Sequence, residues 1–368
     1  MTIAITGARG FLGWHTACRL LATRGEEAVL LGREEFADPA LLARKLADVD
    51  TVIHIAGVNR AETDEEIEQG NIALAEALAT ALGDRPVHVV YASTVMVAMD
   101  TPYGRGKTRA GEILGALPGT TATVLMPNLF GEHGRPAYNS FIATFAHEVA
   151  HGRQPSVTGD RQIPLLHAQD AAEVLIAAAE KRQDDLITPE AEPHGISEVL
   201  DLLNEFHTTY AATGDIPDVS TKFRLDLFNT YRAALWPHGY PILKPVHADN
   251  RGELIETVRS HGGQGQAYVS STKPGQTRGE HYHLRKIERF VVFKGEAEIK
   301  LRRLFHDEVL TFRVSGDQPA HLDMPTMWVH NIVNVGDTDV ITAFWADQLL
   351  DPVNPDQYPM KVVPEVAQ

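Results

Sequence analysis

The sequence has a single cysteine, Cys18, so the chain cannot form an internal disulfide. A protein without disulfides suits a reducing compartment, and we predict a cytoplasmic location. No stretch approaches the roughly 20 apolar residues that span a bilayer. The chain starts directly on a strand-like pattern, and we expect no signal peptide. These absences argue against a membrane partner and against a small secreted domain held by disulfides.

Basic residues are also scarce, with 33 Lys and Arg against 49 Asp and Glu and a formal net charge of −16. Such a surface repels a phosphate backbone, which excludes nucleic acid as the main partner. A nucleotide ligand remains compatible, because one arginine or one helix N-terminus can hold a phosphate. With 43% hydrophobic and 22% charged residues, the composition is that of an ordinary soluble enzyme. At 368 residues, two domains are expected.

The pattern along the chain divides near residue 244. The first 180 residues or so alternate short apolar runs with amphipathic segments, which predicts an α/β fold with a Rossmann-like, doubly wound parallel sheet. The expected strands are 2–6, 28–31, 51–56, 88–93 and 121–126, and the expected helices include 13–24, 67–82, 107–114, 197–203 and 225–235. After Pro241, "YPILKPVHADNRG" has the composition of a linker. We therefore predict a first domain over 1–244 and a second over 245–368.

Short β-rich runs fill the second part of the sequence. They cover 267–270, 289–293, 297–302, 309–314 and 340–345, with turn residues between them. Many short strands at this spacing predict an antiparallel barrel or sandwich.

A glycine-rich turn follows the first expected strand. "ITGARGFLG" places Gly7, Gly10 and Gly13 between a strand and a helix, where a pyrophosphate can approach the backbone. Phe11 and Leu12 belong to the same run and are expected to contact the same cofactor. At the end of the next strand, "LLGRE" has Arg33 where NAD-binding folds place an acidic residue. A guanidinium there pairs with a 2′-phosphate and favours NADP(H), although a solvated arginine beside two glutamates is the alternative.

Candidate catalytic residues follow two later strands. "VIHIAG" places His54, Ala56 and Gly57 near the expected ribose and nicotinamide. Tyr103 and Lys107 are four residues apart and share a helical face, so the ammonium is expected to lower the phenol's pKa and make it a proton donor to a carbonyl. The hydroxyl of Thr94, or of Ser93, can bind the same carbonyl oxygen.

These segments fall in the order found in extended short-chain dehydrogenases/reductases, and residues 1 to about 180 resemble that family. The matching segments are "TGARGFLG", "HIAG", "AST", "YGRGK" and "PNLFG". The resemblance implies Tyr103 as the acid, Lys107 as its activator and ribose anchor, and Thr94 as carbonyl hydrogen-bond donor. It also implies a substrate-side position for Asn128. Gly106 replaces a common serine, which leaves the Tyr103 and Lys107 chemistry in place.

The second domain carries "GEHYHLRKIERF" and, later, "MPTMWVHNIVN". Residues two apart on a strand point the same way, so His281 and His283 share one interior, with Glu288 and His330 from neighbouring strands. Three imidazoles and a carboxylate suit a divalent transition ion. The pattern is similar to the two cupin motifs, which implies that these four residues are metal ligands and favours zinc. The second motif departs at Met327, where glycine is usual, so a different turn is expected there.

The sequence leaves the acid and base of a cupin reaction open. Tyr282, His261, His321 and Glu280 are candidates only by their nearness in sequence. "DNRGELIE" resembles the start of cupin-type sugar-nucleotide 3,5-epimerases, which implies that Arg251 and Glu256 approach the substrate. A plain turn followed by a strand is the alternative.

Over its whole length the sequence resembles the bifunctional capsular polysaccharide enzymes of the CapF family, on segments such as "PGQTRGEHYH", "KIERFVVFKGEAEIKLR" and "FNTYRAAL". The resemblance implies that the cupin domain epimerises C3 of a UDP-2-acetamido-2,6-dideoxy-hexos-4-ulose. The reductase domain then reduces C4 with NADPH, giving UDP-N-acetyl-6-deoxy-L-talosamine, a precursor of N-acetyl-L-fucosamine. A homodimer is the family expectation.

Three other functions fit parts of the sequence. In the first, the protein is a 4-keto-sugar-nucleotide reductase whose cupin is only structural or dimerising. In the second, it is an NADP-binding regulator with a sugar-sensing cupin, although a sensor needs no proton donor such as Tyr103. In the third, the metal ligands serve a dioxygenase, which the fused reductase argues against.

Overall fold

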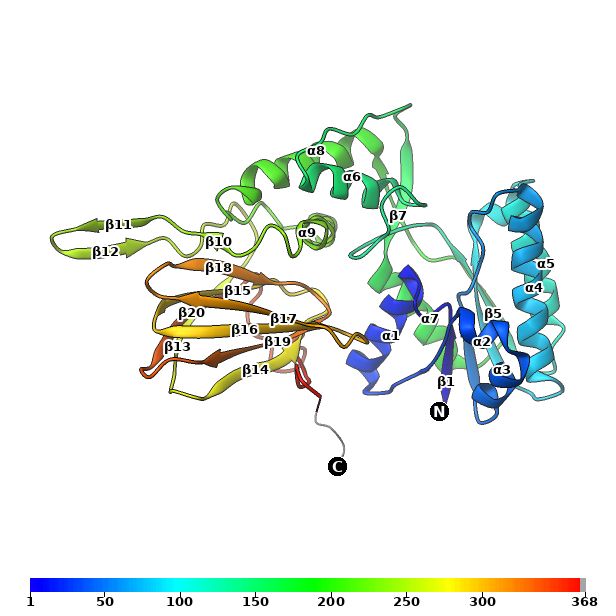
Figure 1. Ribbon diagram of the computed structural model, residues 1–368. Coiled ribbons are helices and arrows are strands. Elements are labelled where there is room, and N and C mark those ends of the chain that lie inside the picture. The colour runs from blue at the N-terminus through cyan, green and yellow to red at the C-terminus, as the bar shows by residue number, and fades with distance from the viewer. Residues whose placement is uncertain (365–368) are drawn as a thin grey trace. The chain divides into compact units, whose positions relative to one another are not determined.

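The structure is a computed structural model that describes residues 1–364. The chain forms two compact units, and Figure 1 shows the course of the chain. Unit 1 comprises Met1–Phe130, Ala137–Ser140 and Arg161–Gly195, and unit 2 comprises Gly131–Pro136, Phe141–Asp160 and the chain from Ile196 onward. The last four residues of the predicted second domain lie outside the described residues.

Unit 1 is built on a six-stranded parallel sheet of order β2-β1-β3-β4-β5-β8. Its strands are β1 (Ile3–Thr6), β2 (Val29–Leu31), β3 (Thr51–His54), β4 (His88–Thr94), β5 (Thr121–Met126) and β8 (Asp185–Ile187). The chain runs outward in both directions from β1 and β3, which is a doubly wound arrangement. The Rossmann-like prediction is therefore confirmed. A smaller sheet joins β6 (Asn128–Phe130), β7 (Gln162–His167) and β9 (Glu192–Gly195).

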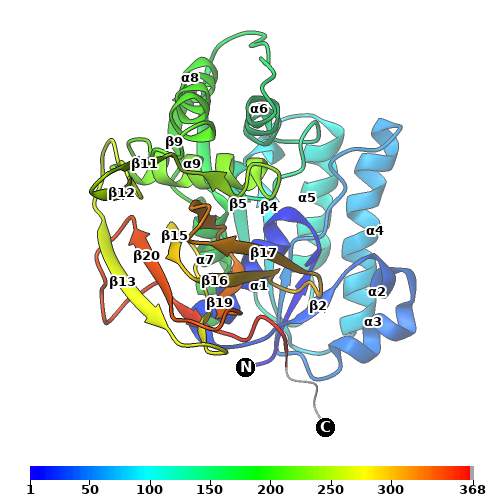
Figure 2. The same ribbon diagram turned by 60° about the vertical axis from the view of Figure 1, so that its left-hand side comes forward.

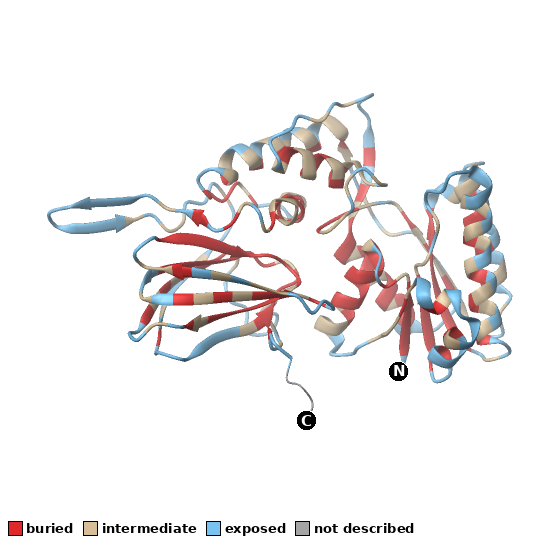
Figure 3. Cartoon of the chain, viewed as in Figure 1, coloured by how far each residue is buried: buried red, intermediate tan, exposed pale blue. Residues whose placement is uncertain are grey.

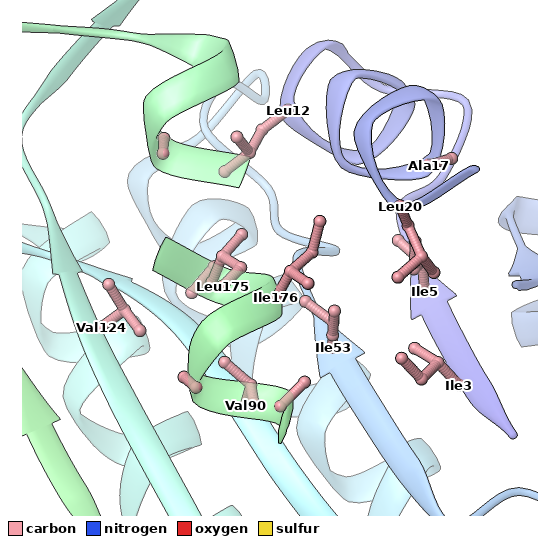
Figure 4. Close-up of a cluster of buried hydrophobic side chains, with 14 of the residues drawn as sticks. Ile3, Ile5, Leu12, Ala17, Leu20, Ile53, Val90, Val124, Leu175 and Ile176 are labelled. Carbon is pink, nitrogen blue, oxygen red and sulfur yellow. The ribbon is translucent and has the colours of Figure 1, made fainter. Parts of the chain in front are cut away.

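Helices cover both faces of the parallel sheet. The helices of unit 1 are α1 (Phe11–Arg24), α2 (Arg33–Ala37), α3 (Pro39–Leu46), α4 (Asp64–Leu82), α5 (Pro102–Gly115) and α7 (Ala168–Lys181), with a 3-10 turn at Val95–Ala98. Alternate sheet residues bury against α1 and α7, as Ile53 does beside Ile176 in Figure 4. Residues of the opposite parity bury against α3, α4 and α5. A sheet buried on both faces explains its nearly continuous apolar strands.

Unit 2 contains two five-stranded antiparallel sheets. One has the order β10-β18-β15-β20-β13, with strands β10 (Ile242–Leu243), β18 (Ala320–Met324), β15 (Glu288–Lys294), β20 (Val340–Ala346) and β13 (Gln266–Thr272). The other has the order β17-β16-β19-β14-β21, with strands β17 (Val309–Ser315), β16 (Glu296–Arg303), β19 (Trp328–Asn334), β14 (Thr277–Tyr282) and β21 (Tyr358–Pro359). The antiparallel β prediction is confirmed. A closed barrel is not, because strand pairing among the described residues leaves two separate sheets.

Helices from the middle of the chain also belong to unit 2. They are α6 (Phe141–Ala150), α8 (Ile196–Phe206), α9 (Lys222–Leu235) and a π-helical turn, η2 (His207–Ala211). Their aromatic residues form a buried cluster in which the Phe206 and Phe228 rings lie 5.3 Å apart. By contact, residues 196–244 group with the C-terminal strands. The sequence-based limit at residue 244 stays a prediction about functional domains.

The segment predicted as an irregular linker is instead paired. β11 (Val246–Asp249) and β12 (Gly252–Ile255) form a hairpin, with Val246 opposite Ile255. Pro241 and Pro245 each stand just before a strand, where the missing N–H breaks no ladder. The hairpin extends away from the two sheets of its unit and is exposed over nearly all of its residues (Figures 1 and 3).

A buried ion pair joins two strands of unit 2, and a helical tyrosine bonds to it. Arg289 on β15 donates two hydrogen bonds to Asp323 on β18, at 2.6 and 2.8 Å, and both side chains are fully buried. Tyr210 of η2 donates to the same carboxylate at 2.5 Å. Burial opposes ionisation of Asp323, but the adjacent guanidinium outweighs it and holds the pKa of that carboxyl below its usual range. The pair fixes η2 against β18.

We expect Asp323→Asn to destabilise unit 2 by roughly 3–5 kcal/mol, because it leaves Arg289 buried without its counter-charge. Urea unfolding followed by tryptophan fluorescence measures the change. The control is Asp249→Asn, which removes the carboxylate of the exposed Asp249–Arg251 pair. That variant should keep the wild-type midpoint, and equal midpoints for both variants would contradict the role given to Asp323.

Candidate nucleotide and metal sites

The glycine turn between β1 and α1 is closed too tightly for side chains. A β-carbon on Gly13 would lie 2.2 Å from the Gly7 carbonyl oxygen, and one on Gly7 would lie 2.9 Å from the Ala56 nitrogen. Gly7 also has a φ of +66°, which favours glycine. No side chain caps α1 at Gly10, and no acidic residue stands in its first turn. The free N–H groups of this helix start are therefore suited to a phosphate group.

Two arginines lie at the corner where β2 ends. Arg33 is the first residue of α2 and is exposed. Arg9, from the glycine turn, forms an exposed ion pair with Glu34 at 3.4 Å, and its side chain lies about 3.7 Å from where a Gly32 β-carbon would be. Sequence reasoning named Arg33 and missed Arg9. The sequence feature that pointed to Arg9 was its position inside the glycine run itself.

His54 lies below the nucleotide turn rather than at its surface. The ring is 1% exposed, contacts the Thr6 hydroxyl through Nδ1 at 2.9 Å and stacks on Tyr91. Burial, with a smaller contribution from Lys107, lowers the pKa of His54 to about 3, so the ring is neutral. Thr6 also accepts the backbone N–H of Ala56 at 3.1 Å. His54 thus supports the turn, and Ala56 and Gly57 are the parts of "HIAG" nearer the surface.

Tyr103 and Lys107 both lie on α5, one turn apart, as predicted from their spacing. Lys107 is buried; its Nζ donates to the Ala92 carbonyl oxygen at 2.7 Å and lies 4.5 Å from the Tyr91 ring centre. A β-carbon on Gly57 would be 3.7 Å from the same Nζ. The lysine therefore joins α5 to the ends of β3 and β4, the carboxyl edge where ligands bind in such sheets.

The electrostatics of this pair differ from the sequence-based expectation. Burial, with a smaller contribution from Tyr138, raises the pKa of Tyr103 to about 12, whereas a lowered value was predicted. Burial also lowers the pKa of Lys107 to about 7, so the lysine carries less charge than its usual pKa implies. The predicted lowering of the Tyr103 pKa was wrong for this state, because burial dominates and Lys107 makes no opposing contribution. A phenol with a raised pKa stays protonated and remains a proton donor.

The other reductase candidates lie in two places. Thr94 ends β4 and is buried, and its hydroxyl accepts the Met96 N–H at 3.2 Å as the cap of a 3-10 turn. Ser93, next to it, is also buried. Asn128 begins β6 and is exposed. Their roles stay predictions.

The four predicted metal ligands of unit 2 come together. His281, His283, Glu288 and His330 are buried, and one ligand atom from each lies within 4.8 Å of all the others. Nε2 atoms of the three histidines lie 3.5, 3.2 and 3.1 Å from the same Glu288 oxygen. Burial opposes ionisation of Glu288, but the three imidazoles outweigh it and hold the pKa of this carboxyl well below its usual value.

This donor set fits a divalent transition ion. Backbone carbonyl oxygens orient two of the rings. His283 Nδ1 lies 2.5 Å from the Asp356 carbonyl oxygen, and His330 Nδ1 lies 3.1 Å from the Trp328 carbonyl oxygen. Such contacts leave Nε2 free to bind a metal. The buried Nε2 of His281 has no hydrogen-bond partner among the described residues. The cluster draws on both sheets, since β14 and β19 lie in one and β15 in the other.

Met327 has a backbone conformation that glycine adopts more readily than other residues. Its φ is +61°, a left-handed value that costs a non-glycine residue about 1 kcal/mol. The side chain is fully buried, and the Met327 N–H donates to the His283 carbonyl oxygen at 2.7 Å. The different turn expected from the sequence at Met327 stays a prediction.

The candidate acids and bases named from sequence lie elsewhere. His321 faces the side of β18 opposite to the cluster and packs against Gly214, while Tyr282 stacks on Tyr358. Glu280 accepts hydrogen bonds from Asn331 and the Val362 N–H, and His261 lies 3.4 Å from Asp215.

The two predicted substrate residues form exposed ion pairs. Arg251 is paired with Asp249, and Glu256 is paired with Arg259. A tyrosine that sequence reasoning missed does bond to the cluster: the hydroxyl of Tyr268 on β13 donates to Glu288 at 2.7 Å.

The burial of Lys107 makes stability depend on pH. Its folded pKa of about 7 lies below the unfolded value, so between about pH 7 and 10 the unfolded chain holds one more proton. We expect the stability of the wild type relative to Lys107→Met to rise by about 1.4 kcal/mol per pH unit in this range. Urea unfolding of both proteins at several pH values measures it. Lys45→Met, at an exposed site, should show no such trend. If the stability difference between wild type and Lys107→Met does not change with pH, the lowered pKa of Lys107 is refuted.

Comparisons with known proteins agree with this division of sites. Residues 3–188 match the NAD dependent epimerase/dehydratase family, and residues 247–358 match the polysaccharide biosynthesis C-terminal domain. Among the described residues, no helix has the length and apolar character needed to cross a membrane.

Relatives match the whole chain. UDP-2-acetamido-2,6-beta-L-arabino-hexul-4-ose reductase of Pseudomonas aeruginosa is 30% identical over 372 residues, covering 98% of this chain and 99% of its own. The crystal structure of the capsular polysaccharide assembling protein CapF from Staphylococcus aureus matches with a TM-score of 0.60 and 30% identity, over 98% of this chain and 100% of its own. UDP-N-acetylglucosamine 4-epimerase from Bacillus cereus shares the fold over 56% of this chain and 82% of its own, with a TM-score of 0.51 and 21% identity. The chain therefore belongs to the NAD-dependent epimerase/dehydratase family and, over its full length, to the CapF-like enzymes within it.

Proposed function

We propose that this protein is a bifunctional sugar-nucleotide enzyme. The cupin domain, residues 245–368, epimerises C3 of a UDP-2-acetamido-2,6-dideoxy-hexos-4-ulose, and the reductase domain, residues 1–244, reduces the C4 ketone with NADPH. The product is UDP-N-acetyl-6-deoxy-L-talosamine, on the route to UDP-N-acetyl-L-fucosamine for capsule or O-antigen. The observation that carries this proposal is the full-length match to a reductase of such a hexulose, in a chain that has both a nucleotide turn and a buried three-histidine cluster.

In the reduction, NADPH supplies the hydride to C4. Tyr103, which stays protonated at neutral pH, donates its proton to the ketone oxygen, and Thr94 donates a hydrogen bond to the same oxygen. Lys107 anchors the cofactor ribose from its buried position on α5. Asn128 contacts the sugar nucleotide on the substrate side.

In the epimerisation, His281, His283, Glu288 and His330 would hold a divalent ion, with zinc preferred, and the two sheets would act as a cupin. The ion would supply Lewis-acid stabilisation of negative charge on the ketone oxygen. The C3 hydrogen is acidified by the neighbouring ketone, and the same ketone later accepts the hydride. The alternative is a cupin that only stabilises or dimerises the protein.

We further propose a homodimer. The β11–β12 hairpin supports it, because an isolated two-stranded hairpin is marginal in water and this one exposes Leu254 at 66% and Val246 at 37%. Arg251 lies in this hairpin and Glu256 directly after it. Their proposed contact with a substrate therefore depends on the position that the hairpin takes in the dimer.

The preference for NADPH is tested at the β2 corner. We expect Arg33→Ala to raise the KM for NADPH about 10-fold or more and to leave that for NADH unchanged, because a charge-assisted bond to a 2′-phosphate contributes roughly 1.5–3 kcal/mol. Steady-state rates with each coenzyme measure the split. Arg44→Ala, at an exposed position on α3, is the control. Equal effects on both coenzymes would refute the assignment.

The two reactions are measured separately on the substrate UDP-2-acetamido-2,6-dideoxy-β-L-arabino-hexos-4-ulose. NADPH absorbance reports the reduction, and NMR of the product reports the configuration at C3. We expect Tyr103→Phe to slow NADPH oxidation at least 100-fold while C3 exchange with deuterated water continues. Glu288→Gln should abolish that exchange, and reduction should then give the product that retains the original C3 configuration. Glu296→Gln, an exposed change on β16, is the control. NADPH oxidation by wild type without C3 inversion would favour the structural cupin, and no oxidation would sink the substrate assignment.

A further inference from the structure

The two oxygens of Glu288 have different partners. Oε2 faces the three imidazoles at 3.1 to 3.5 Å. Oε1 accepts a hydrogen bond from the Tyr268 hydroxyl at 2.7 Å. Glu288 is 3% exposed, so an unbonded Oε1 would be a buried acceptor without a partner, which is costly. The tyrosine therefore fixes which carboxylate oxygen points at the metal cluster.

The Tyr268 ring is itself held in place. It stacks on Phe344 with ring centres 5.0 Å apart and planes at 8°. The ladders pair Tyr268 with Phe344, and both Gln266 and Glu288 with Ala346, so these side chains share one face of the sheet. Figure 2 shows β13 running beside β20 at the edge of this sheet. The hydroxyl is thus delivered to Glu288 by a rigid, packed ring.

The same ring borders a cavity of about 230 Å³ in unit 2, which is also lined by Gln266, Lys286, Ala346 and Gln357. Tyr268 is 43% exposed, while the cluster residues on its other side are buried. One tyrosine therefore stands between an open cavity and the carboxylate of the cluster. A residue in this place can set both how Glu288 binds an ion and how the cavity meets it.

We propose that Tyr268 is a positioning residue of the metal centre, which keeps Glu288 a one-oxygen ligand by occupying Oε1. This inference rests on the proposed metal site. Without the hydroxyl, the carboxylate can turn and offer both oxygens to the ion, or lose its alignment with the histidines. Partners of this kind commonly change metal affinity 10- to 100-fold when removed.

The test uses full-length protein and the metal alone. Tyr268→Phe keeps the ring and its stacking on Phe344 and removes only the hydroxyl. Zinc affinity is measured by competition with a chromophoric chelator, and coordination by the visible spectrum of the cobalt(II) form. We expect zinc binding about 10-fold or more weaker and a changed cobalt spectrum. Ser270→Ala is the matched control, because this hydroxyl on the same strand has no hydrogen-bond partner in the described chain.

Each outcome decides the inference. Wild-type affinity and spectrum in Tyr268→Phe, with circular dichroism showing a folded protein, would overturn it. Loss of affinity in Ser270→Ala to the same extent would also overturn it, because the effect would then be a general one of β13. A wild-type protein that binds no ion would remove the metal site and this role together. If wild type binds the ion but does not invert C3, the proposed function fails while the role of Tyr268 stands.

Discussion

Two neighbouring charges on β15 constrain unit 2. Glu288 and Arg289 are adjacent on one strand and point to opposite faces, yet both are buried. Moving an ion out of water costs several kcal/mol unless it is paired and hydrogen-bonded. Arg289 is compensated by two bonds to Asp323, and Glu288 by the hydroxyl of Tyr268 and the three imidazoles. The strand therefore depends on the carboxylate of β18 on one side and on the histidine cluster with Tyr268 on the other.

This constraint connects the architecture of the unit to its site. The side of β15 that carries Arg289 requires η2, whose Tyr210 completes the shell around Asp323. The side that carries Glu288 requires strands from both sheets, because His281, His283 and His330 approach from β14, its following turn and β19. A change that loosens the helices is expected to shift β15 and with it the carboxylate. The stability of the unit and the geometry of the histidine–glutamate cluster are therefore expected to be linked through the backbone of one strand.

Sequence reasoning succeeded where a pattern is local. The parallel sheet followed from apolar runs alternating with amphipathic segments, and the cluster of His281, His283, Glu288 and His330 followed from spacing along two motifs. It failed where the answer depends on which strands are neighbours. Tyr268 reaches Glu288 only because β20 lies between β13 and β15, and nothing in "QAYVSST" announces that order. Likewise the linker composition of 240–252 concealed a hairpin, and the depth of Lys107 could not be read from its spacing to Tyr103.

The depth of Lys107 also bears on the direction of the proposed chemistry. An oxidation of an alcohol needs a base, and a phenol serves as one only if its pKa is brought well below the usual value. Here burial raises the pKa of Tyr103 to about 12 and lowers that of Lys107 to about 7, so the pair holds its proton on the phenol. In this state the phenol of Tyr103 keeps its proton at neutral pH, and little phenolate is present to take a proton from an alcohol. The protonation state that the proposed reduction needs at Tyr103 is therefore already present in the chain without cofactor.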